Sequence, residues 1–230
     1  MKRKQIRLWD LPTRLFHWLL ALGVIGAIVS GQIGGNLMEW HARIGLLIIG
    51  LIVFRLAWGL LGTTYARFGH FFPTAAKVKA YLKGEWKGPG HNPLGALSVF
   101  GLLGLVAVQA ISGLFANDDI AFVGPLVDLV GKDLSNRLTG LHHLAANLLF
   151  VLVGLHLVAI AYYAHFKKDN LVKPMLTGWK ETEHGEHARG GGLPALLFSL
   201  ALACAAVYGA SGIWLPEPPA PEPAVETPSW

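Results

Sequence analysis

Four histidines interrupt the long apolar stretches of this 230-residue chain: His17, His41, His142 and His156. An ionisable side chain inside an apolar segment is costly and tends to have a function. Imidazole is a common metal ligand. Two imidazoles that face each other across a helix bundle form an axial ligand pair for one haem iron. The chemistry that these residues suggest is therefore haem ligation.

The spacing within residues 139–165 supports this interpretation. His142 and His156 are separated by 14 positions, so at about 100° per residue they share a helix face to within about 40°. At 1.5 Å per residue they lie roughly 21 Å apart along the axis. His143 is about 140° away from His156 on the same helix. We therefore expect His142 to be the partner of His156 in register, and His143 to face elsewhere.

Depth in the predicted helices then pairs the four histidines. His17 and His156 lie toward one side of the bilayer, whereas His41 and His142 lie toward the other. Two stacked pairs would hold two haems and carry electrons from one face to the other. The alternative is that all four bond to hydroxyls or carbonyls of neighbouring helices. Zinc is disfavoured because no Asp, Glu or Cys joins the histidines and no H-E-x-x-H is present.

Two arginines complete the candidate site. Arg55 lies 14 positions after His41 and so shares its inward face, at the depth of the His17 pair. A buried arginine needs a partner, which a haem propionate or a quinone oxygen would supply; a backbone carbonyl or snorkelling to the surface is the alternative. Arg14, near His17, is a second candidate for a propionate, or a plain surface anchor.

Five apolar runs of roughly 18 or more residues predict membrane-spanning helices. They cover about residues 11–30, 40–61, 94–116, 139–165 and 193–215. The runs are continuous rather than alternating, so helices are favoured over a barrel. Small residues of the third run, Gly101, Gly104 and Gly113, would let a helix or a flat macrocycle approach closely. Gln109 in that run is a weaker candidate for a quinone contact.

Lysine and arginine predict the orientation. Three segments contain 15 of the 19 basic residues: the N-terminal arm with the first helix entry, the connection between the second and third helices, and the segment between the fourth and fifth. Two helices separate each segment from the next, so all three fall on one side. We expect that side, with the N-terminus, to be cytoplasmic and the C-terminus to be periplasmic, in a bacterial inner membrane.

The domain organisation follows from these runs. Residues 1–180 form the expected four-helix bundle, 181–192 a cytoplasmic linker, 193–215 the fifth transmembrane helix and 216–230 a Pro-rich acidic tail. Residues 74–86 are predicted to form a short helix on the lipid surface. His184 and His187 of the linker form an H-x-x-H whose flanking Gly and Glu favour a solvated segment over a metal site.

Composition excludes several classes of protein. With 53% hydrophobic and only 14% charged residues, the chain is neither disordered nor an ordinary soluble domain. The net charge of +5 therefore indicates a membrane surface and not a nucleic acid as partner. The single cysteine excludes internal disulfides, an iron–sulfur cluster and a Cys-rich zinc site. No C-x-x-C-H is present, so haem cannot be attached covalently in the c-type manner.

Several motifs resemble the bacterial cytochrome b561 family, which includes the b-type cytochrome subunits of nickel–iron hydrogenases. They are Trp9-Asp10-Leu11-Pro12-Thr13-Arg14-Leu15-Phe16-His17-Trp18, then Glu39-Trp40-His41-Ala42-Arg43-Ile44-Gly45 with Arg55, and the segment from Leu141-His142-His143 through His156 to Asn170. The resemblance implies a four-helix core with two non-covalent b haems, ligated by His17, His41, His142 and His156, and exchange of electrons with quinone. The fifth helix and the acidic tail depart from that core, and we expect them to dock a partner subunit or support an oligomer.

The sequence therefore predicts an all-α membrane protein that transfers electrons between the quinone pool and a redox partner. That partner is a cytochrome c, a dehydrogenase or hydrogenase, or superoxide, and whether the chain itself counts as an enzyme stays open. The alternatives are a haem-free transporter or assembly scaffold, and an integral membrane metalloenzyme. A transporter would need polar groups along a route, which residues 94–116 and 193–215 nearly lack.

Overall fold

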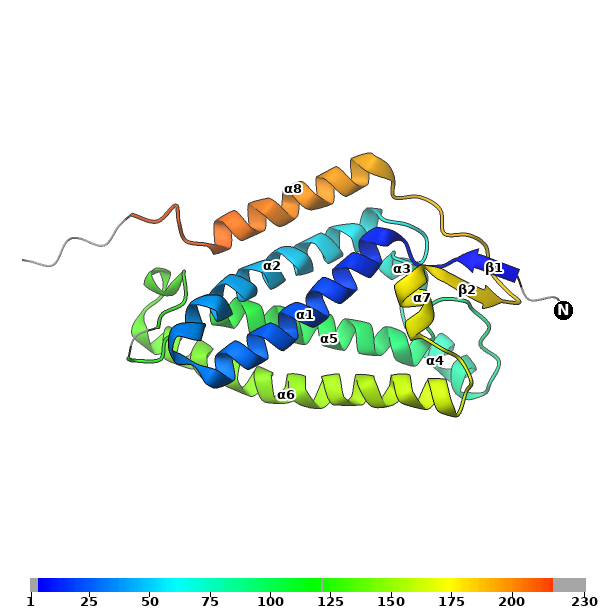
Figure 1. The fold of residues 1–230 in the computed structure, drawn as a ribbon, viewed down its shortest axis with the longest axis horizontal. Coiled ribbons are helices and arrows are strands. Elements are labelled where there is room, and N and C mark those ends of the chain that lie inside the picture. Colours follow the sequence, from blue (N-terminus) through cyan, green and yellow to red (C-terminus); the bar gives the residue numbers. More distant parts are fainter. Residues whose placement is uncertain (1–3, 121, 217–230) are drawn as a thin grey trace, which may run out of the picture.

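The computed structural model describes residues 4–120 and 122–216, and its architecture is that of an all-α membrane protein. Five helices are long and apolar enough to cross a bilayer, which confirms the predicted fold class (Figure 1). They are α1 (Leu11–Ile33), α2 (Met38–Leu61), α5 (Pro93–Gly113), α6 (Lys132–His165) and α8 (Gly192–Ala210). The fourth span begins earlier than expected because residues 132–138 already belong to α6.

Short elements connect these helices. They are β1 (Lys4–Arg7), η1 (Gly35–Leu37), α3 (Phe68–Phe71), α4 (Ala75–Leu82), η2 (Val127–Leu129), α7 (Val172–Thr177) and β2 (Trp179–Thr182). Helix α4 is the short surface helix expected within residues 74–86. Helix α8 ends at Ala210, before the expected position 215. Of the acidic tail, residues 217–230 lie outside the described part of the chain.

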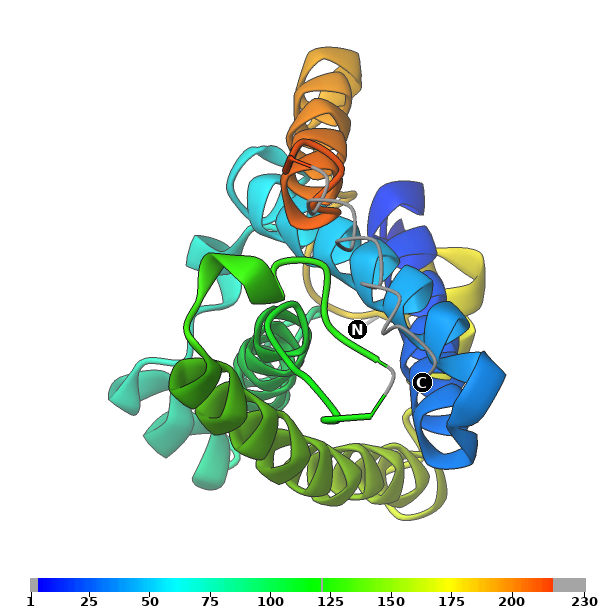
Figure 2. The same ribbon diagram turned by 90° about the vertical axis from the view of Figure 1, so that its left-hand side faces the viewer.

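The four helices α1, α2, α5 and α6 surround an interior that holds the site. Helix α1 packs on α2, α2 on α5, and α5 on α6. Among the described residues, α6 packs closely with neither α1 nor α2, so the helices that carry the paired histidines are held apart. Seen from one end, the connection between α5 and α6 lies over this interior (Figure 2).

Apolar side chains join the helices where they do touch. Ile48 and Ile52 of α2 pack with Val106 of α5 and Leu149 of α6 in one buried cluster. Many other large apolar side chains are exposed, and the outward faces of α1 and α6 carry a large share of them. A soluble monomer rarely exposes such a surface, and a lipid bilayer is the solvent that suits it.

The spans begin where the sequence supplies caps. The Asp10 side chain accepts a hydrogen bond from the backbone N–H of Thr13, and Pro12 stands in the first turn of α1. Asn92 caps α5 in the same way, with Pro93 as the first helical residue. A carboxylate or amide cap satisfies free N–H groups, and proline at the first positions loses no helical bond. Both signals thereby fix where the chain enters the bundle.

The bundle has a basic end and an opposite end. The basic end carries β1, the connection of residues 62–92 and the segment of residues 166–191, whereas the opposite end carries the connections of residues 34–37 and 114–131 (Figure 1). The three basic segments therefore gather at one end, as their separation by two helices each predicted. At this end β1 pairs with β2 in antiparallel register, with Lys4 opposite Thr182 and Arg7 opposite Trp179.

The strand pair shows that the segment expected to be a cytoplasmic linker is attached to the bundle. The boundary drawn at residue 180 falls inside β2, and the residues after it are bound to the bundle. The backbone N–H of Ala188 donates to the Arg7 carbonyl, and the Tyr65 hydroxyl donates to the Glu186 carbonyl. The sequence could not show this because the partners lie more than 120 positions away.

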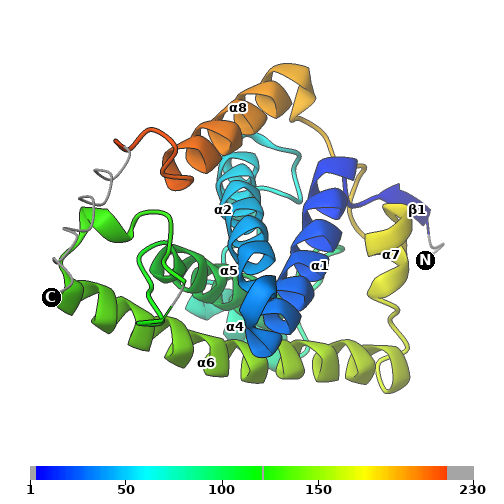
Figure 3. The same cartoon turned by 60° about the vertical axis from the view of Figure 1, so that its left-hand side comes forward.

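Helix α8 packs on the outer face of α2, outside the ring of four helices (Figure 3). The approach is close at Gly50 of α2, where an added Cβ atom would lie 2.8 Å from the Val207 side chain of α8. A glycine at this point lets the two helices pack tightly. One face of α8 is thus used within the chain, which settles that the fifth helix packs on the core.

Candidate functional site

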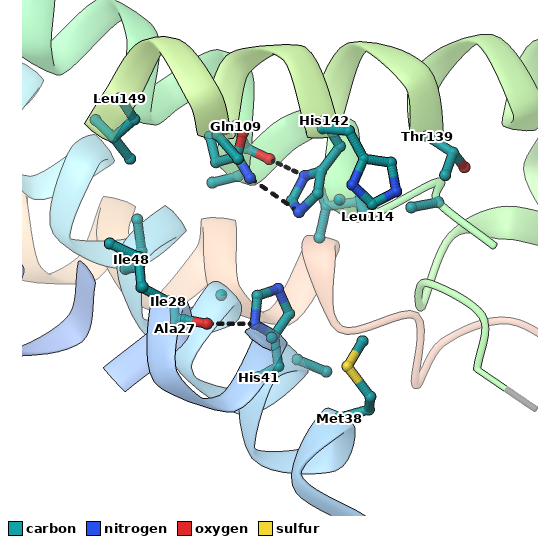
Figure 4. Close-up of a pocket in the computed structure, with 18 of the residues that line it drawn as sticks. Ala27, Ile28, Met38, His41, Ile48, Gln109, Leu114, Thr139, His142 and Leu149 are labelled. Carbon is teal, nitrogen blue, oxygen red and sulfur yellow. Dashed lines mark hydrogen bonds between the residues drawn. The ribbon is translucent and has the colours of Figure 1, made fainter. Parts of the chain in front are cut away.

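His41 of α2 and His142 of α6 face each other near the opposite end (Figure 4). Their ring centroids lie 6.0 Å apart and the ring planes are nearly perpendicular, at 79°. Both rings line a cavity of about 250 Å³ to which α1, α2, α5 and α6 all contribute. The structure thereby brings together the two histidines that sequence depth had paired.

Backbone carbonyls fix the protonation state of both rings. The Nδ1 atom of His41 lies 2.8 Å from the Ala27 carbonyl oxygen, and that of His142 lies 2.8 Å from the Gln109 carbonyl oxygen. A carbonyl can only accept, so both Nδ1 atoms carry a hydrogen, and in the neutral imidazole each Nε2 atom then keeps a lone pair. Metal-ligating histidines are oriented in this way, by a bond from the other ring nitrogen. In the structure the Nε2 lone pair of His142 accepts from the Gln109 amide at 2.9 Å.

Two glycines make room for these rings. A Cβ atom on Gly31 of α1 would lie 3.0 Å from the His41 ring, and one on Gly113 of α5 would lie 2.9 Å from the His142 ring. Gly113 is one of the glycines at which the sequence predicted the close approach of a helix or macrocycle, whereas Gly31 is not. At Gly101 and Gly104 an added Cβ atom would meet nothing within 4 Å, so the close approach is specific to Gly113.

His17 and His156 occupy the equivalent positions toward the basic end, on α1 and α6. The Nδ1 atom of His17 is buried and has no hydrogen-bond partner among the described residues. Among the described residues, α1 and α6 do not pack closely on each other.

Arg55 is a buried cation beside this second pair. Its side chain is 3% exposed, and its guanidinium lies over Phe68 at 4.5 Å and over Phe16 at 6.0 Å from the ring centroids. The Nη1 atom is buried and has no acceptor among the described residues. Aromatic faces stabilise a cation only partly, and a buried charge needs a full partner. The open donor at Nη1 therefore points to a missing acceptor.

Arg14 already donates a hydrogen bond within the protein. Its guanidinium Nη2 atom donates to the Leu176 carbonyl, and the neighbouring Trp18 indole donates to the Met175 carbonyl at 3.3 Å. These bonds hold α7 against the start of α1. The Nε atom of Arg14 is buried and has no hydrogen-bond partner among the described residues, so it is one donor available to a cofactor carboxylate.

Asp10 has a larger role than the sequence indicated. Besides capping α1, its carboxylate accepts from the Trp58 indole at 3.0 Å and from the Thr63 hydroxyl at 2.5 Å. The carboxylate is buried, and it ties the beginning of α1 to the end of α2. The only sequence signal was an aspartate just before the predicted helix, with proline two positions later. That pattern predicts a cap but not the two distant donors.

His91, just before α5, was not predicted from the sequence to be buried. Its ring lies between Trp9 and Phe71, at centroid distances of 4.7 and 4.6 Å, and its Nδ1 atom is buried without a partner. Burial is the main cause that lowers the pKa of His91 to about 3, and the positive charges of Arg55 and His17 contribute to this shift. His91 is therefore neutral at physiological pH and belongs to the surroundings of the basic-end pair.

His143 differs in part from the expectation. Its side chain is exposed, but it also contributes to the lining of the cavity of His41 and His142, and its ring centroid lies 6.3 Å from that of His142. A helix position about 100° from a ligand still reaches the rim of a wide cavity. Within residues 4–120 and 122–216, no group of three or more His, Cys, Asp or Glu side chains is placed to hold a metal ion.

Comparison with known families identifies the fold. The model of the prokaryotic cytochrome b561 family matches residues 8–178, which include all four candidate histidines. This chain belongs to the prokaryotic cytochrome b561 family. As a member it is a multi-pass membrane b-type cytochrome that transfers electrons and uses haem b.

Relatives of this cytochrome include three hydrogenase subunits. The proteins named "Probable Ni/Fe-hydrogenase B-type cytochrome subunit" from Azotobacter chroococcum mcd 1 and Azotobacter vinelandii are both 26% identical to it. Each alignment covers 78% of this chain and 90% of the relative. The protein of the same name from Rhodobacter capsulatus is 24% identical over 77% of this chain and 82% of its own length. No solved structure shows a significant match.

The residues present fit haem b. His41 and His142 each keep an Nε2 lone pair within one cavity, and Gly31 and Gly113 leave space beside the two rings. At the basic end the unpartnered atoms of His17, Arg55 and Arg14 provide one ring nitrogen and two donors for carboxylates. These are the group types that ligate iron and bind propionates.

Substitution of Gly113 by alanine tests the space beside His142. The added methyl group would lie 2.9 Å from the ring, which has to move away from its carbonyl partner. If His41 and His142 bind haem, we expect that haem to be lost from the purified variant, with the helical circular dichroism unchanged. Gly104→Ala on the same helix is the matched control, because nothing lies within 4 Å of its added methyl group. Equal haem content in both variants would contradict the assigned role of Gly113.

Proposed function

We propose that the cytochrome holds two b haems, one at each end of the bundle, and moves electrons across the membrane between quinone and a redox partner. The observation that carries this proposal is the His41–His142 pair, with both Nδ1 atoms bonded to carbonyls and both Nε2 lone pairs free of hydrogen in a shared cavity. His17 and His156 form the second proposed ligand pair, toward the basic end, with His156 14 positions after His142 on α6.

The protein residues hold and orient the cofactors. His17, His41, His142 and His156 donate nitrogen lone pairs from opposite sides of each site. When bound, haem would supply one-electron oxidation and reduction at its iron atom. Arg55 donates to a propionate or to a quinone oxygen, and Arg14 donates to a propionate through its remaining N–H. Apolar side chains of all four helices keep water away from the sites.

The partner is proposed from the relatives and from charge. The relatives' name assigns them to nickel–iron hydrogenases, so a hydrogenase or another membrane-bound or periplasmic redox protein is the proposed donor. The basic end is proposed to face the cytoplasm of a bacterial inner membrane, because basic residues are retained there. Helix α8 keeps an exposed apolar face, with Leu197 and Phe198 among its exposed side chains, and we propose this face as a contact with a larger complex.

Haem counting and quinol reduction test this function together. The full chain, purified after haem-replete expression, should show a reduced-minus-oxidised b-type band and two haems b per chain by pyridine haemochrome assay. A soluble quinol analogue should reduce it, and Arg55→Leu should slow that reduction. A pure protein without iron would favour the haem-free transporter or scaffold. One haem per chain would contradict the two-site arrangement while leaving the family assignment intact.

A further inference from the structure

A second cavity lies at the basic end, apart from the histidine pairs, with a volume of about 350 Å³. The connection of residues 65–93 forms most of its wall, and Gly185 of the segment after β2 closes one side. Helix α4 and the start of α5 flank it, so it lies where the spans meet the lipid headgroups. Trp86 and Tyr65 in its lining are the aromatic types typical of that level.

The lining is cationic. Lys77 and Lys87 contribute two positive charges, and none of the lining residues that the structure describes is acidic. The positive charges act on a titratable group in the lining. Burial lowers the pKa of His70, and the charges of Lys77 and Arg67 lower it further. The nearby Glu186 does not neutralise this field, because it pairs with Arg189.

Several donors of the cavity are unused. Lys87 has no hydrogen bond or ion pair to any described residue, and the His184 ring is also without one. Lys77 donates to the carbonyls of His70 and Phe72, which leaves one of its three N–H groups. Unpaired donors around a cationic cavity indicate a ligand with several acceptor oxygens.

We propose that this cavity binds the phosphate group of an anionic phospholipid, with Lys77 and Lys87 as its charged contacts. A phosphate diester supplies the acceptors that these donors lack, and basic pockets at the cytoplasmic headgroup level favour such lipids. Phe72 and Leu82 beside the cavity are exposed and provide an apolar surface for the acyl chains. The site needs neither haem nor a redox partner, so it stands independently of the proposed electron transfer.

Native mass spectrometry of the full chain in detergent tests the site. Phosphatidylglycerol, phosphatidylcholine and inorganic phosphate are titrated separately. We expect phosphatidylglycerol to bind more tightly than the other two, and Lys87→Gln to weaken its binding about fivefold, with a larger loss when Lys77→Gln is added. Lys87 makes no internal bond, so its replacement should leave the fold and the haem spectrum unchanged.

Lys83→Gln is the matched control. It removes the same charge from the same end, but Lys83 does not line the cavity. If Lys83→Gln and Lys87→Gln weakened phosphatidylglycerol binding equally, general surface charge would explain the effect, and the proposed site would be overturned. Equal binding of phosphatidylglycerol and phosphatidylcholine would overturn it as well. Inorganic phosphate that binds as tightly as phosphatidylglycerol would overturn the lipid source.

Discussion

His142→Ala should remove the haem at the opposite end and leave the one at the basic end in place. The substitution deletes one of the two facing Nε2 lone pairs, and His41 alone cannot hold the cofactor in its axial position. The two sites are about 14 helical residues apart on α6, roughly 21 Å, so their losses should be independent. Haem per chain is expected to fall from two to one by pyridine haemochrome assay.

His143→Ala is the control for this prediction. His143 is next in sequence and contributes to the same cavity rim, but its side chain is exposed. We expect both haems to be retained and quinol reduction to continue. If His143→Ala and His142→Ala lost the same haem, His143 would be a ligand and the register argument on α6 would be wrong.

Asp10→Ala should cause a large loss of stability at the basic end. It removes the cap of α1 and leaves the Trp58 indole and the Thr63 hydroxyl without their acceptor. A lost cap and a buried unpaired donor together cost about 3 kcal/mol. Unfolding in SDS, followed by circular dichroism, measures this loss. The start of α1 carries His17, so the haem at the basic end should dissociate first.

Two further variants separate the contributions of Asp10. Asn is also a good cap, so Asp10→Asn should keep the Thr13 bond but not all of the acceptors for Trp58 and Thr63, and lose an intermediate amount of stability. Asp133→Ala removes an exposed carboxylate from the first turn of α6 and should cost only a few tenths of a kcal/mol. Similar losses for Asp133→Ala and Asp10→Ala would show that the buried network contributes nothing.

The spans and the histidine pairing could be predicted from the sequence because both depend on local periodicity. Apolar length defined the five helices, and the 14-position spacing put His142 and His156 on one face. Depth in the helices then predicted that His41 lies beside His142, and their rings do lie 6.0 Å apart. Ligation itself remains a prediction of the residue chemistry.

What the sequence could not predict depends on contacts between distant segments. The strand pair joins two segments that are far apart in sequence, one before the first span and one after the fourth. Four residues such as Lys4–Arg7 carry no clear strand pattern of their own. The position of Asp10 just before a predicted helix is typical of a cap. Its bonds to Trp58 and Thr63 could not be predicted, because they form only when α1 meets the end of α2. His91 appeared as a loop residue because nothing local indicates that Trp9 and Phe71 enclose it.

The pairing of β1 with β2 also sets an order of events during synthesis. Residues 4–7 leave the ribosome first, but their partner strand follows only after α6 has crossed the bilayer and α7 has formed. Until then the Gly178 carbonyl cannot accept from the N–H groups of Leu8 and Trp9, and α7 cannot lie against α1. The basic end therefore stays uncovered while the four helices assemble.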